Sequence, residues 1–97
     1  MEEDTSQQKH QARIYGEILE ERDRQDQKWG GQAHDDKHDP CDWIAFIRRH
    51  IDKIGDAEFP EVYRRQMIRV AALALAAIEA CDRRTDHGVG DETFDRE

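Results

Sequence analysis

Apolar residues recur at helical spacing along three stretches of the chain, and no stretch alternates in the manner of a β-strand. The first stretch places Ile14 and Ile18 on one narrow stripe, which predicts a helix over residues 11–28. The pair Gly30-Gly31 follows, and glycines at this position typically end a helix.

The second helix has clear signals at both ends. Asp39 is a good N-terminal cap, and Pro40 suits the first turn of a helix. Apolar positions then continue at helical spacing from Trp43 to Ile54, and Gly55 follows them. We therefore predict a helix over residues 40–54.

The third helix is predicted from Pro60 to about Arg84. One face of it carries Tyr63, Met67, Val70, Ala74, Ala77, Ile78 and Cys81. Between Val70 and Ala80 the helix is apolar nearly all round and rich in alanine, so further helices can pack closely on more than one side. A single short chain cannot cover that surface, and we expect two copies to share a core.

These patterns predict an all-α fold, in which a three-helix subunit assembles into a helical-bundle dimer or tetramer (a dimer of dimers). Residues 11–84 form the single domain. Residues 1–10 are polar and are expected to be loose, and residues 85–97 are expected to form a disordered acidic tail.

The net charge of −8 disfavours nucleic acid and anionic membranes as partners. The longest apolar run, residues 70–78, is far shorter than the ~20 residues needed to span a bilayer. Cys41 and Cys81 lie far apart with no secretory segment before them, which favours reduced thiols in a cytoplasm.

The segment before the second helix concentrates side chains that bind metals. His34, Asp35, Asp36 and His38 could hold a divalent ion, with Glu21 as a further ligand. The alternative is a polar loop in which the aspartates close turns and the histidines are solvated, because no standard zinc spacing is present.

Three groups around this segment are candidates for ligand contacts. His50 lies on the apolar stripe of the second helix, either as a bonded core imidazole or as a ligand-facing group. Trp29 and Trp43 flank the His/Asp segment and could cover an aromatic base or close the core. The first helix carries a polar face, either solvated or facing a ligand, at Glu21, Gln25 and Lys28.

The two later helices each carry a cluster of cations: Arg48, Arg49 and Lys53 on one, and Arg64, Arg65 and Arg69 on the other. Arg49 with Lys53, and Arg65 with Arg69, bring like charges together at i,i+4 spacing, which is unfavourable alone. Carboxylates of the first helix could offset the repulsion, or a phosphate-bearing ligand could do so.

The first helix ends ERDRQDQKWGG, the next segment reads HDDKHDPCDW, and the last helix contains YRRQMIRVAALALAAIEACDRR. This combination resembles small phage and prophage proteins related to the MazG-like all-α nucleotide pyrophosphohydrolases. The resemblance covers about residues 14–84. It implies a helical homo-oligomer in a host-cell cytoplasm that binds a nucleotide near the junction of its helices.

The chain departs from those enzymes at the metal site. The resemblance implies an acidic EExxE set and an ExxD-type set that hold Mg²⁺. The matching positions here read RHIDK, residues 49–53, and RQMIR, residues 65–69, so cations stand where oxygen ligands are needed.

We therefore expect a catalytically degenerate nucleotide-binding protein without a cofactor. Its phosphate contacts would come from Arg49, His50, Lys53, Arg65 and Arg69 in one cleft. The alternatives are a metal-dependent nucleotide phosphohydrolase at the His/Asp segment, and a phage protein that binds a host factor through its acidic surface.

Overall fold

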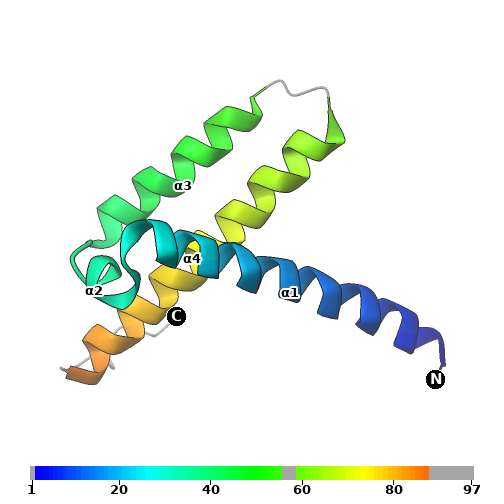
Figure 1. Cartoon of the computed structure of the whole chain (residues 1–97), viewed down its shortest axis with the longest axis horizontal. Helices are drawn as coiled ribbons and strands as arrows, with labels where there is room; N and C mark the ends of the chain where they lie inside the picture. Colours follow the sequence, from blue (N-terminus) through cyan, green and yellow to red (C-terminus); the bar gives the residue numbers. More distant parts are fainter. Residues whose placement is uncertain (1, 56–58, 88–97) are drawn as a thin grey trace, which may run out of the picture.

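The computed structural model describes residues 2–55 and 59–87, and helices make up nearly all of this described part. The helices are α1 (Glu2–Trp29), α2 (Gly31–Asp35), α3 (Pro40–Ile54) and α4 (Pro60–His87) (Figure 1). No β-strand occurs among those residues. The predicted all-α fold is confirmed, with one short helix more than the sequence pattern indicated.

Helix α1 is longer than predicted, because it begins at Glu2 and not near residue 11. The side chains of residues 5–10 are exposed, so packing within the subunit does not explain this extension. No glycine or proline occurs before Gly16, and Glu, Gln and Lys are good helix formers. The segment expected to be loose is therefore helical from Glu2 onward, and it projects from the rest of the molecule (Figure 1).

The Gly-Gly pair ends α1 as predicted and also starts a new turn of helix. Gly30 has a φ of 114° and Gly31 a φ of 67°, which residues with a side chain rarely adopt. The Gly30 N–H still donates to the Asp26 carbonyl at 2.8 Å, and α2 follows at once. This short helix, which the sequence pattern did not predict, brings His34 and Asp35 back toward α1.

Helix α3 begins and ends as predicted. The Asp39 carboxylate accepts from the Asp42 N–H at 3.0 Å, and the Asp42 carboxylate accepts from the Asp39 N–H at 3.2 Å. This reciprocal cap satisfies N–H groups that the helix itself leaves unpaired. Helices α3 and α4 then run antiparallel side by side, and α1 crosses α4 (Figure 1).

The core is small and lies along α4. Its buried apolar residues are Trp43 from α3 and Ala72, Ala76 and Ala80 from α4. Alanines at this spacing let α3 and α1 approach α4 closely. Ala77, on the apolar face identified from the sequence, packs against this core.

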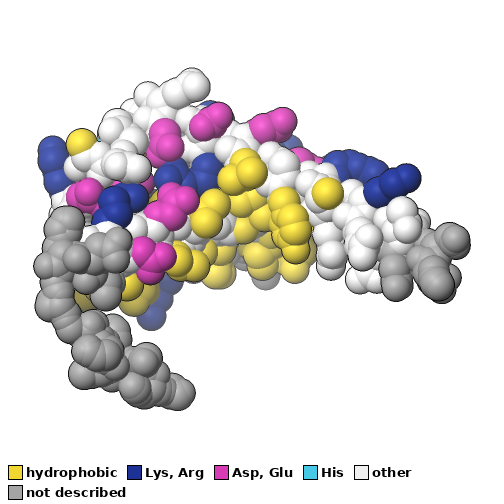
Figure 2. All heavy atoms as spheres, turned by 90° about the horizontal axis from the view of Figure 1, so that it is seen from below, with side chains coloured by type: hydrophobic (Ala, Val, Ile, Leu, Met, Phe, Trp, Pro, Cys, Tyr) yellow, Lys and Arg dark blue, Asp and Glu magenta, His cyan; other side chains and the backbone are white. Residues whose placement is uncertain are grey.

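Large apolar side chains remain uncovered within the single chain. Tyr63, Met67 and Ile78, on the apolar face of α4 that we expect a second copy to cover, are 53%, 38% and 58% exposed. Leu19 of α1 is 57% exposed. Figure 2 shows hydrophobic side chains gathered over one face of the molecule. Such a surface is unusual for a monomer.

Helix α4 continues through His87, beyond the predicted end near Arg84. The rest of the segment expected to be a disordered tail, residues 88–97, lies outside the described residues. Cys41 and Cys81 are both exposed and are not joined by a disulfide. Among the described helices, none combines the length and apolar character needed to cross a membrane.

Candidate functional site

A cavity of about 200 Å³, which we call the aromatic cavity, lies where the end of α1 and α2 meet α3 and α4. It is lined by Arg22, Gln25, Asp26, Trp29, His34, Asp35, His38, Trp43, Phe46, Arg49, His50, Leu73 and Ala76. Each of the four helices contributes to this lining. The His/Asp segment and the second helix predicted from sequence therefore meet at one place.

Aromatic rings form a continuous wall of the cavity. Trp29 stacks on His34, with ring centroids 5.9 Å apart and planes inclined by 22°. His34 meets the edge of His38 at 4.6 Å, and His38 makes edge contacts with Trp43 at 5.7 Å and Phe46 at 4.9 Å. Trp29 is 54% exposed, whereas Trp43 is buried, so the wall runs from the surface into the core. A planar ligand would find both ring faces and ring edges to pack against.

The two histidines of this wall are hydrogen-bonded to each other. His38 Nε2 lies 3.0 Å from His34 Nε2, and His38 Nδ1 lies 3.2 Å from the Asp42 carboxylate. A carboxylate only accepts, so Nδ1 of His38 carries the proton. In neutral His38 the Nε2 atom is then an acceptor, and His34 donates to it. Asp42 thus orients both rings in addition to capping α3.

Arg22, a buried cation beside the cavity, contacts acidic residues of three helices. Arg22 of α1 is 9% exposed and donates to Asp26 and, at 2.8 Å, to Glu79 of α4. Its Nη2 atom also lies 3.7 Å from the Asp35 carboxylate of α2. Burial alone would lower the pKa of Arg22, but the hydrogen bonds to Glu79 and Asp26 outweigh it and leave the pKa raised.

Two buried acceptors on the cavity wall have no hydrogen-bond donor among the described residues. They are Oδ2 of Asp35 and Oε1 of Gln25. Asp35 is 6% exposed and Gln25 is 7% exposed. Burial raises the pKa of Asp35, and the attraction of Arg22 only partly offsets that effect. Since the amide of Gln25 donates to Glu21 at 3.1 Å, its oxygen is the end left without a partner.

His50 combines both roles considered from the sequence. Its Nδ1 atom lies 2.8 Å from the side-chain oxygen of Gln66, which is itself buried on α4. An amide oxygen only accepts, so Nδ1 of His50 donates. The same residue lines the aromatic cavity.

A second and more open hollow of about 400 Å³, which we call the charged hollow, separates α1 from the start of α4. It is lined by Glu17, Glu21, Glu61, Arg64, Arg65, Ile68 and Arg69. Arg64 donates to both oxygens of Glu17, at 2.7 and 2.9 Å, and Arg69 lies 3.9 Å from Glu21. Carboxylates of α1 therefore offset the charge of these two cations, which is one of the two explanations considered from the sequence.

Hydrogen bonds to arginine also set the protonation of the carboxylates in the charged hollow. The hydrogen bond from Arg64 lowers the pKa of Glu17. The hydrogen bond from Arg24 does the same to the pKa of Glu21, with smaller contributions from Gln25 and Arg69. Both carboxylates are thus held in the charged form beside the arginines of α4.

The structure does not bring the predicted phosphate contacts into one cleft. Arg49 and His50 line the aromatic cavity, whereas Arg65 and Arg69 line the charged hollow. Lys53 is exposed and lines neither. Helix α1 lines both hollows, with Gln25 and Trp29 at the aromatic cavity and Glu21 at the charged hollow.

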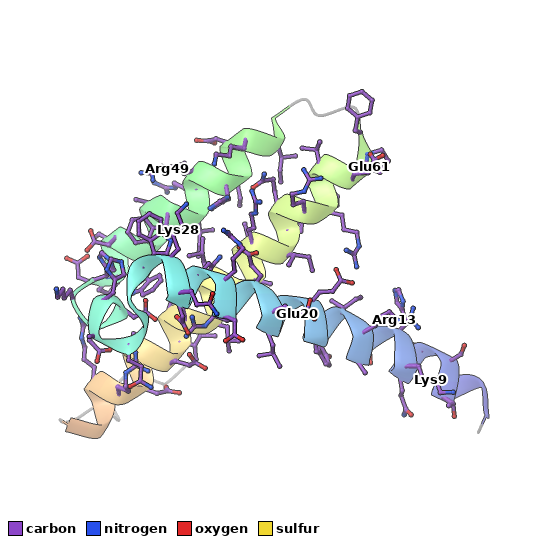
Figure 3. All side chains as sticks on the ribbon, in the orientation of Figure 1. Lys9, Arg13, Glu20, Lys28, Arg49 and Glu61 are labelled. Atoms are coloured by element: carbon purple, nitrogen blue, oxygen red, sulfur yellow. The ribbon has the colours of Figure 1, made fainter. Side chains whose placement is uncertain are left out.

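Lys28, predicted as a ligand contact, lies at the surface near the cavity. Its ammonium group is 4.9 Å from the centre of the Trp29 ring. Figure 3 shows Lys28 and Arg49 where the end of α1 passes α3, far from Lys9 and Arg13 on the projecting part of α1.

The His/Asp segment does not gather all of its predicted metal ligands. His34 and His38 face each other, but Asp35 faces Arg22 and Asp36 bonds Arg83 at 2.9 Å. Within the described residues, no group of three or more His, Cys, Asp or Glu side chains is placed to hold a metal ion.

Sequence reasoning missed Arg22 and Asp26 as residues of the site. One signal was present: Arg22 continues the stripe of Ile14 and Ile18 at a spacing of four, where an apolar residue would be expected. A charged residue on the buried face of a helix indicates an ion pair with another element.

Protein-family models, curated proteins and solved structures were compared with this chain, and none of them matches. We therefore infer function from the geometry of the aromatic cavity.

Proposed function

We propose that this protein binds a nucleotide or a similar phosphate-bearing ligand and holds its planar base in the aromatic cavity. The observation that carries this proposal is the wall of rings from Trp29 through His34 and His38 to Trp43. Small-molecule sites typically measure about 300–1,000 Å³. A cavity of about 200 Å³ suits a base, with the sugar and phosphates at its mouth.

Arg49 is the cation suited to the phosphates. Both Arg22 and Arg49 line the cavity, but Arg22 is buried and shared among acidic partners. Arg49 is exposed, and no ion pair with it is found in the described part of the chain. A guanidinium at the mouth can bind two phosphate oxygens at once.

We further propose binding without pyrophosphate hydrolysis, in a catalytically degenerate, phage-encoded and cytoplasmic relative of the MazG-like enzymes. Arg49, Lys53, Arg65 and Arg69 occupy the positions where that resemblance implies Mg²⁺ ligands. Cations there would repel a divalent ion.

A second candidate is a metal-dependent phosphohydrolase that uses His34 and His38. The facing ring nitrogens, 3.0 Å apart, favour it, and Asp42 orients His38 as carboxylates often orient metal-binding histidines. Catalytic zinc sites usually have three protein ligands, however, and no third is placed beside this pair among the described residues. We therefore rank this candidate second.

The functional unit that we propose is a homo-oligomer. The uncovered apolar residues Leu19 and Ile78 come from the two helices that cross, α1 and α4. A second copy that packs on these residues would remove this apolar surface from water.

Calorimetry tests the proposal. Purine and pyrimidine mono-, di- and triphosphates would be titrated into the protein in EDTA. We expect binding with quenching of tryptophan fluorescence, because a base stacks near Trp29. Arg49→Gln should weaken triphosphate binding by about tenfold, as expected when one charged hydrogen-bonding group is lost.

Arg48→Gln is the matched control, because it makes the same charge change on the neighbouring exposed residue, outside both hollows. The proposal fails if the folded protein binds none of the nucleotides. It also fails if Arg48→Gln and Arg49→Gln weaken binding equally.

A further inference from the structure

Two side-chain acceptors of residues that line the aromatic cavity lack a hydrogen-bond donor in the described part of the chain. Oδ2 of Asp35 and Oε1 of Gln25 are both shielded from solvent and have no donor within the described residues. Buried polar groups in folded proteins nearly always have partners, so two such acceptors on one cavity wall require an explanation.

Neighbouring donors do not supply the missing bonds. Arg22 Nη2 is 3.7 Å from Asp35, too far for a hydrogen bond, while it bonds Glu79 at 2.8 Å. The amide nitrogen of Gln25 is held by Glu21. These donors are therefore engaged with other acceptors, and both Asp35 and Gln25 belong to the lining of the aromatic cavity.

We infer that the aromatic cavity selects a planar heterocycle with adjacent N–H donors on one edge, and guanine is the nucleobase of this kind. This inference rests on the proposed function and narrows it to one class of base. Asp35 would accept from guanine N1–H and N2–H, and Gln25 would accept from a remaining N–H.

The chemistry of the other bases fits the cavity less well. A carboxylate accepts two parallel N–H bonds but offers no donor. Adenine and cytosine place a ring acceptor beside their amino group, and uracil flanks its single N–H with two carbonyl oxygens. Each of these would direct a lone pair at the Asp35 carboxylate. Hypoxanthine keeps the N1–H of guanine but lacks the amino group.

The base would supply the donors that these acceptors lack. A cavity of about 200 Å³ has room for several waters in the free protein, since each occupies about 30 Å³ in the liquid. Guanine would displace those waters, donate to Asp35 and pack its faces on the aromatic wall. A base without the donors would leave the acceptors unpaired, which is strongly unfavourable.

The test is calorimetry of the full chain in EDTA with GMP, IMP, AMP and UMP. GMP should bind about tenfold or more tightly than IMP, which lacks only the amino group, and UMP should bind most weakly. This comparison needs no variant. GMP binding no tighter than IMP or UMP would overturn the inference while leaving nucleotide binding intact.

Two variants connect the selectivity to Asp35. Asp35→Asn keeps the shape but presents an N–H₂ donor, so GMP affinity should fall about tenfold or more and the preference over IMP should narrow. Asp36→Asn is the control, because Asp36 is exposed, bonds Arg83 and does not line the cavity.

Circular dichroism establishes that each variant is folded. A folded Asp35→Asn protein with unchanged GMP affinity and selectivity would overturn the role of Asp35. Absence of binding by every nucleotide would instead reject the proposed function itself.

Discussion

Replacing Arg22 by Met would remove the cation that connects α1, α2 and α4. Arg22 is 9% exposed, bonds Glu79 at 2.8 Å and lies 3.7 Å from Asp35. Methionine keeps most of the apolar stem but removes the guanidinium that Asp26, Asp35 and Glu79 share, which leaves Arg83 as a cation close to Asp35 and Glu79. We therefore expect a large loss of stability.

The solvent exposure of Asp26, Asp35 and Glu79 determines how much stability the Arg22→Met variant loses. Removing one member of a buried ion pair typically costs about 3–5 kcal/mol. The side chains of Asp26 and Glu79 are 36% and 44% exposed, so water screens part of their repulsion, whereas that of Asp35 is 8% exposed. We expect about 3 kcal/mol of destabilisation, at the lower end of that range. For a domain of this size, this lowers the melting temperature by about 12–24 °C.

Urea and thermal unfolding followed by circular dichroism would measure the effect. Arg24→Met is the control, because Arg24 is 51% exposed at its side chain and, within the described residues, forms an ion pair only with Glu21 of its own helix. Exposed pairs contribute about 0–1 kcal/mol. Glu79→Gln in the Arg22→Met background should restore part of the loss, since it removes one of the uncompensated charges. If Arg22→Met is no less stable than Arg24→Met, the buried ion pair does not connect the helices as we argue.

Three further predictions concern the cap, the exposed face and the buried carboxyl. Asp39→Ala should lower the free energy of unfolding by about 1 kcal/mol, because it removes the cap of α3; an unchanged urea midpoint would contradict this. Leu19→Glu should produce a smaller species in sedimentation velocity, whereas a wild type that is already monomeric would refute the oligomer. Asp35→Asn should raise the free energy of unfolding at pH 7, because burial raises the pKa of Asp35 and ionisation then opposes folding. The stability gained by the variant should shrink as the pH falls through the raised pKa, because the wild type then folds with the Asp35 carboxyl protonated. If the variant is instead less stable than the wild type, by a difference that grows with pH, the attraction of Arg22 dominates.

The ends of helices were predicted well from the sequence, because a capping residue, a proline or a glycine acts on the backbone within a few residues of itself. Asp39, Pro40 and Gly55 predicted both ends of α3, and the Gly-Gly pair predicted the end of α1. The short helix α2 was missed, because two glycines with positive φ usually indicate a turn and not the start of a helix.

Packing was harder to predict, because it depends on which helix faces which. The apolar pattern of α4 could not distinguish the alanine face that packs within the subunit from the face with Tyr63, Met67 and Ile78. Periodicity gives the angle between side chains on one helix but not the position of the neighbouring helix.

The site was predicted in part for the same reason. Five of the ligand contacts predicted from the sequence line the aromatic cavity: Gln25, Trp29, Trp43, Arg49 and His50. Arg65 and Arg69 were assigned to the same cleft, yet they line the charged hollow. The i,i+4 spacing of Arg65 and Arg69 indicates that these like charges need an acidic partner. The crossing of α1 over α4 determines that Glu21 lies beside Arg69.

Ala76 is shared between the core and the wall of the aromatic cavity, and it is 2% exposed. Ala76 also packs in the core cluster with Trp43 and Ala80. A longer apolar side chain at this position would therefore press on the Trp43 ring as well as fill the cavity. The size of this one residue thus couples the space open to a ligand to the packing of α3 on α4.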